Sequence, residues 1–158
     1  MIHALKYEGW AELAEPMATR MARVALGLNS PLIVPVPTTP QRVRDRGYNQ
    51  AGLLALAYGR GTGRPVVEAL IRRDSGPSQV ALQPLERSAN VRSAFGLNPQ
   101  HGAGGSGLFA LQGAHVVLID DVLTTGATSQ AAARVLLEAG AAEVVVLTFA
   151  RALVSTET

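Results

Sequence analysis

The chain has 158 residues, of which 47% are hydrophobic and 16% are charged. These values are typical of one globular domain with a buried core, and they exclude a disordered or fibrous chain. Lys and Arg number 14 against 12 for Asp and Glu, so there is no strong overall cationic field, and tight nucleic-acid binding by this chain alone is not expected. Cysteine is absent, which excludes disulfides and zinc sites built on thiolates.

Targeting and membrane signals are also missing from the sequence. No run approaches the roughly 20 apolar residues of a membrane span, and the N-terminus lacks the charged and apolar regions of a signal peptide. We therefore expect a cytoplasmic protein without a membrane partner. The histidines, His3, His101 and His115, are widely spaced and are not expected to form a metal site.

The first half of the chain alternates helical and strand patterns. Apolar residues recur at helical intervals over residues 13–28, which predicts an amphipathic helix. The proline-bracketed apolar run 31–37 predicts a buried strand that ends by Val36 and is followed by a loop. Residues 50–59 predict a second helix, and residues 66–70 predict another strand.

Two segments in the middle of the chain lack periodicity. The polar stretch 72–92 is typical of a functional flap or of disorder. The turn-rich stretch 98–107 contains glycines spaced as G-x-G-x-x-G, but they lead into a strand instead of opening a helix. We therefore reject a dinucleotide-binding interpretation.

The last third of the chain predicts a βαβ unit. A strand over residues 114–119 is followed by a polar loop at 120–128, a helix at 129–139 and a strand at 144–147. Such units build parallel sheets through right-handed crossovers. The expected fold class is therefore α/β, with helices on both faces of a mostly parallel sheet.

The polar loop 120–128 has the composition of a site for a phosphorylated sugar. The start of a helix offers unpaired N–H groups and partial positive charge to a phosphate, and two carboxylates accept hydrogen bonds from sugar hydroxyls. The Walker A pattern is absent, which argues against a nucleoside triphosphatase. The alternative, in which these residues only cap the helix, stays open. The candidate catalytic, ribose-binding and Mg²⁺-binding residues are Asp120 and Asp121, followed by the phosphate-binding residues Thr124, Thr125, Gly126, Ala127 and Thr128.

Residues 116–128, VVLIDDVLTTGAT, resemble the signature of type I phosphoribosyltransferases. Four other segments resemble the ComF-like family within that group. These are IHALKY at 2–7, VPVP at 34–37, RDRGYNQA at 44–51, and Gln79 with ERSANV at 86–91. The resemblance covers nearly the whole chain, although the cysteine-rich zinc segment common before this domain is absent. Either this member lacks that segment naturally or the chain is truncated.

The resemblance implies the architecture and further site residues. Residues 1–158 would form a single domain of the type I phosphoribosyltransferase fold, with a small N-terminal hood at 1–30 and a mobile flap at 72–97. A concentration of arginines is visible at Arg42, Arg44 and Arg46, with Arg72 and Arg73 further on; by itself it indicates only a solvated face. The residues implied for pyrophosphate are Thr38, Thr39, Arg44 and Arg46, and those implied for the flap are Gln79, Arg87 and Asn90.

The resemblance implies two alternative functions that share one site. The first is an enzyme that binds phosphoribosyl pyrophosphate with Mg²⁺ and transfers ribosyl phosphate to an unknown base or amine, with inversion and release of pyrophosphate. The second is a non-enzymatic factor in competence and DNA uptake that binds the same ligand and works with a helicase-like ATPase. Dimers are common among phosphoribosyltransferases, so the resemblance adds a homodimer as one candidate state, and the oligomeric state stays open.

Overall fold

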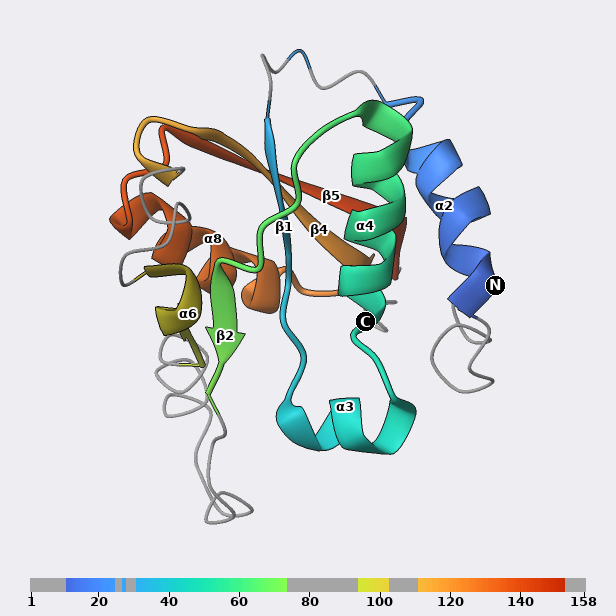
Figure 1. Cartoon of the computed structure of the whole chain (residues 1–158), viewed down its shortest axis with the longest axis horizontal. Coiled ribbons are helices and arrows are strands. Elements are labelled where there is room, and N and C mark those ends of the chain that lie inside the picture. The colour runs from blue at the N-terminus through green and yellow to red at the C-terminus, as the bar shows by residue number, and fades with distance from the viewer. Residues whose placement is uncertain (1–10, 25–26, 28–30, 74–93, 103–110, 153–158) are drawn as a thin grey trace, which may run out of the picture.

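A parallel sheet forms the centre of the molecule (Figure 1). The computed structural model describes residues 11–24, 27, 31–73, 94–102 and 111–152. In the sheet, β4 (His115–Leu123) lies between β1 (Leu32–Pro35) and β5 (Glu143–Arg151) and pairs in parallel with both. Val66 adds an isolated parallel bridge to Ile33 on the other side of β1. Branched apolar residues form these strands because they pack well on a pleated surface.

Helices cover both faces of this sheet. Because its strands are buried on both sides, their sequences are continuous apolar runs. Helix α8 (Ala127–Glu138) packs on one face, while α2 (Ala14–Met21) and α4 (Gln50–Thr62) pack on the other. Successive side chains of a strand point to opposite faces. Along β4, Val116 and Leu118 therefore join the core under α8, and Val117 and Ile119 join the core under α2 and α4. An ion pair between Arg60 and Glu15 links α4 to α2 at the surface.

Smaller elements complete the described part of the chain. A 3₁₀ turn, η1 (Ala11–Leu13), leads into α2, and α3 (Pro40–Arg46) stands beyond the end of β1 (Figure 1). Strands β2 (Leu70–Arg72) and β3 (Phe95–Leu97) form an antiparallel pair, followed by α6 (Pro99–Gly102). Within the described residues, none of the helices is both long and apolar enough to cross a bilayer.

The α/β class and the βαβ unit β4–α8–β5 are confirmed, whereas several boundaries differ from the prediction. The first helix ends at Met21 instead of residue 28, since Val24, the next position of the apolar pattern, is 51% exposed and has no core to face. The loop expected after β1 contains α3. Strand β4 continues to Leu123, because its backbone keeps pairing with β5 beyond the apolar run. Much of the expected hood and flap, residues 1–10 and 74–93, lies outside the described residues.

Candidate functional site

A cavity of about 370 Å³ opens at the carboxyl ends of β1 and β4. Ligands of open parallel sheets bind at this end of the strands, because the loops that follow neighbouring strands diverge there. The volume lies within the usual range for small-molecule sites. The residues that line it are Val36, Pro37, Thr38, Arg42, Arg46, Asn49, Gln50, Ala51, Arg72, Asp120, Asp121, Val122, Thr124 and Thr128.

Both candidate aspartates line the cavity, and both lie in β4 instead of in the loop where the sequence analysis put them. Asp120 is paired with Thr148 of β5, which holds its backbone in the sheet. One oxygen of Asp120 accepts a hydrogen bond from the Asp121 N–H at 2.9 Å, and one of Asp121 accepts from the Val122 N–H at 2.8 Å. A rigid strand and these local bonds therefore fix the two carboxylates.

The loop itself is short and ends at Gly126, which precedes α8. Gly126 has φ of +82°, a left-handed conformation that side chains disfavour, and this sharp turn starts the helix. Thr125 Oγ1 accepts a long hydrogen bond of 3.4 Å from the Ala127 N–H. Of the five candidate phosphate residues, Thr124 and Thr128 line the cavity, while Thr125, Gly126 and Ala127 form the turn between them. The positive end of α8 therefore lies at the cavity.

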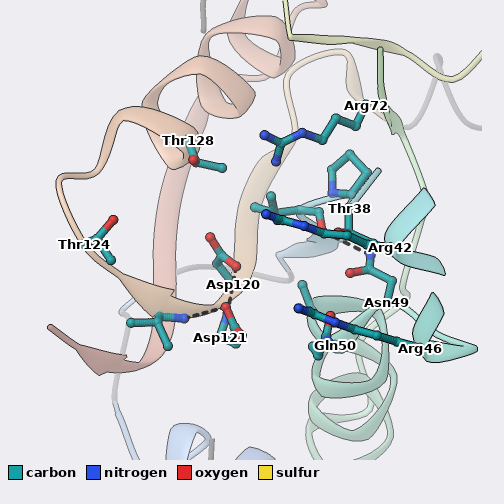
Figure 2. Close-up of a pocket in the computed structure, with 14 residues that line it drawn as sticks. Thr38, Arg42, Arg46, Asn49, Gln50, Arg72, Asp120, Asp121, Thr124 and Thr128 are labelled. Carbon is teal, nitrogen blue, oxygen red and sulfur yellow. Dashed lines mark hydrogen bonds between the residues drawn. The ribbon is translucent and has the colours of Figure 1, made fainter. Parts of the chain in front are cut away.

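The three arginines of α3 lie on two different faces of the helix. Arg42 and Arg46 are one turn apart, so they share a face, and both line the cavity. Arg44 is exposed on another face, where its Nη2 donates to Gln41 Oε1 at 2.8 Å. Figure 2 shows Arg42 and Arg46 extending toward the two aspartates. Arg46 is thus placed as expected for a ligand contact, whereas Arg44 is not in the lining and Arg42 takes that position.

The two candidate threonines after β1 also differ in position. Thr38 lines the cavity. Thr39 is the N-cap of α3, and its Oγ1 accepts from the Arg42 N–H at 3.3 Å. Pro40 at the first position and Gly47 at the C-cap, with φ of +84°, complete the signals that delimit this helix. Thr39 therefore contributes to the site by holding the helix that carries Arg42 and Arg46.

Arg72 of β2 is a cavity residue that the sequence analysis did not assign to the site. Its guanidinium lies 5.3 Å from the centroid of the Phe95 ring on the neighbouring strand β3. Burial lowers the pKa of Arg72, Arg42 lowers it further, and Asp120 raises it. Arginine remains protonated near neutral pH in spite of such shifts, so Arg72 is a fixed positive charge. The bonds of residues 65–67 to Ile33 of β1 and the pairing of β2 with β3 bring it beside the α3 arginines.

Comparison with known protein families identifies the family of this chain. A family model described as the phosphoribosyl transferase domain matches residues 45–158. The chain belongs to the phosphoribosyl transferase family. The resemblance seen in residues 116–128 is thereby confirmed.

Relatives of this phosphoribosyl transferase domain carry names from DNA metabolism. It is 34% identical to the DNA utilization protein YhgH of Escherichia coli K12, over 97% of this chain and 66% of the relative. It is 34% identical to the competence protein ComFC of Bacillus subtilis, over 70% of this chain and 40% of the relative, and 33% identical to competence protein F of Haemophilus influenzae, over 86% and 57%. The expected likeness to ComF proteins is confirmed. The chain spans just under two thirds of the length of its YhgH relatives.

Solved structures show the fold of this phosphoribosyl transferase domain. The glutamine phosphoribosylpyrophosphate amidotransferase of B. subtilis matches with a TM-score of 0.60 at 21% identity, over 88% of this chain and 26% of that one. An allosteric regulatory enzyme of purine biosynthesis matches with a TM-score of 0.58 at 22% identity, again over 88% and 26%. The type I phosphoribosyltransferase fold is therefore confirmed.

The positively and the negatively charged side chains lie on opposite sides of the cavity. Figure 2 shows Arg42, Arg46 and Arg72 on one side and the two aspartates with Thr124 on the other. Three guanidinium groups against two carboxylates leave one net positive charge in the lining. Such a site suits an anionic ligand that also carries hydroxyl groups, because guanidinium binds phosphate oxygens and carboxylate accepts from hydroxyls.

The donor set of this phosphoribosyl transferase domain fits Mg²⁺ that is shared with a ligand. Asp120 and Asp121 offer carboxylate oxygens, which Mg²⁺ prefers. Within the described ranges, no cluster of three or more His, Cys, Asp or Glu side chains could hold an ion by itself. Oxygens of a ligand or of water would therefore complete the coordination.

Asn49 and Gln50 are two further lining residues that sequence reasoning missed. Asn49 Nδ2 donates to the carbonyl oxygen of Val36 at 3.1 Å and so ties the segment after α3 to the end of β1. Gln50 begins α4 and is 4% exposed. The sequence signal that could have identified Asn49 and Gln50 is that both are polar residues at the start of a predicted helix. The expected flap contacts Gln79, Arg87 and Asn90 lie outside the described residues.

Proposed function

We propose that the chain binds phosphoribosyl pyrophosphate with Mg²⁺ and transfers its ribosyl phosphate group to a base or amine acceptor. The main support is one cavity in which Arg42, Arg46 and Arg72 face Asp120 and Asp121 beside the start of α8. Phosphoribosyl pyrophosphate carries phosphate at one end, pyrophosphate at the other and ribose hydroxyls between. The threonine loop suits the first group, the arginines suit the second, and the aspartates suit the third.

In the proposed reaction, the bond between the anomeric carbon and the pyrophosphate oxygen breaks, and its electron pair leaves with pyrophosphate. The acceptor nitrogen donates its lone pair to the anomeric carbon from the opposite side and then loses a proton. Positive charge develops on the ribose ring while negative charge grows on the leaving group. Asp120 and Asp121 would hold the ribose and offset the first charge, and the arginines would stabilise the second.

Bound Mg²⁺ would supply further stabilisation of the pyrophosphate charge. Asp120 and Asp121 are the residues that would hold it, together with oxygens of the ligand. Their role as ribose ligands is compatible with this one, because a carboxylate has two oxygens and about four acceptor positions.

Calorimetry with phosphoribosyl pyrophosphate, with and without Mg²⁺, tests the binding step. We expect saturable binding that is strengthened by Mg²⁺ and weakened at least about 100-fold in Asp120→Asn/Asp121→Asn, since two charged ligand contacts are lost. Asp45→Asn is the matched control, because Asp45 is exposed on α3 and bonds to Gln41 outside the cavity. A folded parent chain that shows no binding would contradict the proposal.

The transfer step requires a separate measurement. Release of pyrophosphate would be followed while nucleobases and amines are supplied as acceptors to the Mg²⁺-loaded protein. An enzyme releases pyrophosphate in an acceptor-dependent manner. Tight binding without release by any acceptor would instead favour a binding protein.

The names of the relatives favour a second candidate, a non-enzymatic factor in DNA utilization or competence. In that function the same site would bind phosphoribosyl pyrophosphate and control contact with a helicase-like partner. The test is deletion of the gene in its own host, followed by restoration with the parent or with Asp120→Asn/Asp121→Asn, and measurement of DNA uptake. Unchanged uptake after deletion would rule this candidate out.

A further inference from the structure

Strand β5 forms one edge of the central sheet and keeps most of its side chains accessible. It pairs with β4 along one side, and among the described strands it has no neighbour on the other. Within its nine residues only Leu147 is buried, and Val146 is 36% exposed. The N–H and C=O groups along the outer side of β5 are therefore available to a further strand.

The sequence of β5 lacks the features with which proteins usually protect an exposed edge. Those features are charged side chains or proline within the strand, a bulge, or a very short strand. The residues between its two ends, VVVLTFA at 144–150, contain neither a charge nor a proline. Its pairing with β4 keeps one constant register from Glu143 to Arg151. A long, regular and apolar edge of this kind favours pairing with another strand.

The charged residues of β5 lie at its two ends and have opposite signs. Glu143 begins the strand, Arg151 ends it, and both are exposed. Glu143 also bonds to His115 Nδ1 at 3.1 Å, but its side chain stays 50% exposed. A second copy of β5, aligned antiparallel over the full length of the strand, would bring Glu143 opposite Arg151 at both ends, because the two strands run in opposite directions.

The same alignment also matches the apolar residues of β5. Leu147 lies at the centre and faces its own copy, and Val145 faces Phe149 on the same side of the sheet. On the other side, Val146 faces Thr148. Pairs of aromatic and β-branched residues, and pairs of opposite charge, stabilise neighbouring antiparallel strands. The edge is thus complementary to itself.

We propose that two copies of the chain associate through β5, which pairs antiparallel with its counterpart and joins the two sheets into one. The two-fold axis passes beside Leu147, so every other contact occurs twice. The lining of the cavity at the ends of β1 and β4 includes no residue of β5. Because the strands of the two copies point in opposite directions, the two cavities open at opposite ends of the joined sheet. The inference therefore goes beyond the proposed function and does not depend on it.

Exchange of the end charges tests this pairing. Sedimentation velocity over a range of concentrations should show the parent as a dimer that dissociates in the micromolar range, as a small interface does. Arg151→Glu and Glu143→Arg each bring like charges together twice in the dimer, so each should weaken association at least about tenfold. The double variant Glu143→Arg/Arg151→Glu has the net charge of the parent and restores the opposite charges, so it should recover most of the association.

A lysine in the middle of the edge provides a second measurement. Val146→Lys introduces a charge between the paired strands and should also weaken association. Leu56→Lys is the matched control, since Leu56 is 48% exposed on α4, which packs on β1 and β4. It should leave association unchanged. Thermal melts establish that each variant is folded, and calorimetry should find the same affinity for phosphoribosyl pyrophosphate in Arg151→Glu as in the parent.

Several outcomes would overturn the proposal. One is a parent chain that stays monomeric at concentrations well above the micromolar range. Another is a dimer that Arg151→Glu does not weaken, that the double variant does not restore, or that Leu56→Lys weakens as much as Val146→Lys does, because the contact would then lie elsewhere. A dimer with the expected responses that binds no phosphoribosyl pyrophosphate would support this inference and refute the proposed function.

Discussion

The positive charge of the cavity comes from side chains on two separate elements, the helix α3 and the strand β2. Arg42 and Arg46 follow β1 in the chain, whereas Arg72 comes from the pair of strands β2 and β3. Arg72 is held by the Phe95 ring and is partly removed from water. A guanidinium held in this way loses little side-chain entropy when a phosphate binds.

Replacing Arg72 should therefore reduce ligand affinity more than replacing Arg44. For Arg72→Ala we expect phosphoribosyl pyrophosphate to bind about 10- to 100-fold more weakly, since a hydrogen bond to a charged group contributes about 1.5–3 kcal/mol. For Arg44→Ala we expect a change within about twofold, because its side chain bonds to Gln41 outside the cavity. Calorimetry measures the affinity of both variants. A larger loss of affinity in Arg44→Ala would show that the wrong face of α3 has been assigned to the cavity.

At the scale of the elements, the sequence located the segment 120–128 that borders the cavity, but of the three arginines in the lining it assigned only Arg46 to the site. The loop is a local pattern in which a buried strand is followed by carboxylates, threonines and Gly126. Helix α3 has only seven residues, too few for an apolar periodicity, although Thr39, Pro40 and Gly47 are ordinary helix boundary residues. The full length of β4 depends on pairing with β5, and the position of Arg72 depends on pairing of β2 with β3. Neither pairing leaves a local signal.

Two glycines, one at the N-cap of α8 and one within α4, should respond oppositely to replacement by alanine. Gly126 has φ of +82° before α8, so Gly126→Ala should lower the free energy of unfolding by about 1–2 kcal/mol. Gly61 lies in the last turn of α4 with nothing within 4 Å of an added Cβ, so Gly61→Ala should raise it by about 0.5–1 kcal/mol. Urea denaturation measures both. Equal effects would contradict the left-handed turn at the start of α8.

At the scale of the whole molecule, the ligand should stabilise the fold because the cavity joins parts that are distant in sequence. Binding at 100 times the dissociation constant adds about 2.7 kcal/mol to the free energy of unfolding, which corresponds to about 5–10 °C in melting temperature for a domain of this size. Phosphoribosyl pyrophosphate with Mg²⁺ should produce this shift in the parent. At the same ligand concentration, Asp120→Asn/Asp121→Asn should show little or none, as a thermal melt can establish.

The pairing of the central strand has a consequence for the order in which the molecule folds. Val116 of β4 pairs with Val144, 28 positions further on, but with Leu32, 84 positions earlier. Contacts between distant segments cost more loop-closure entropy and form more slowly. We therefore expect β4, α8 and β5 to assemble first and β1 to dock afterwards, bringing α3 with it. A chain caught between these steps would hold the threonine loop and both aspartates while lacking the arginines that face them.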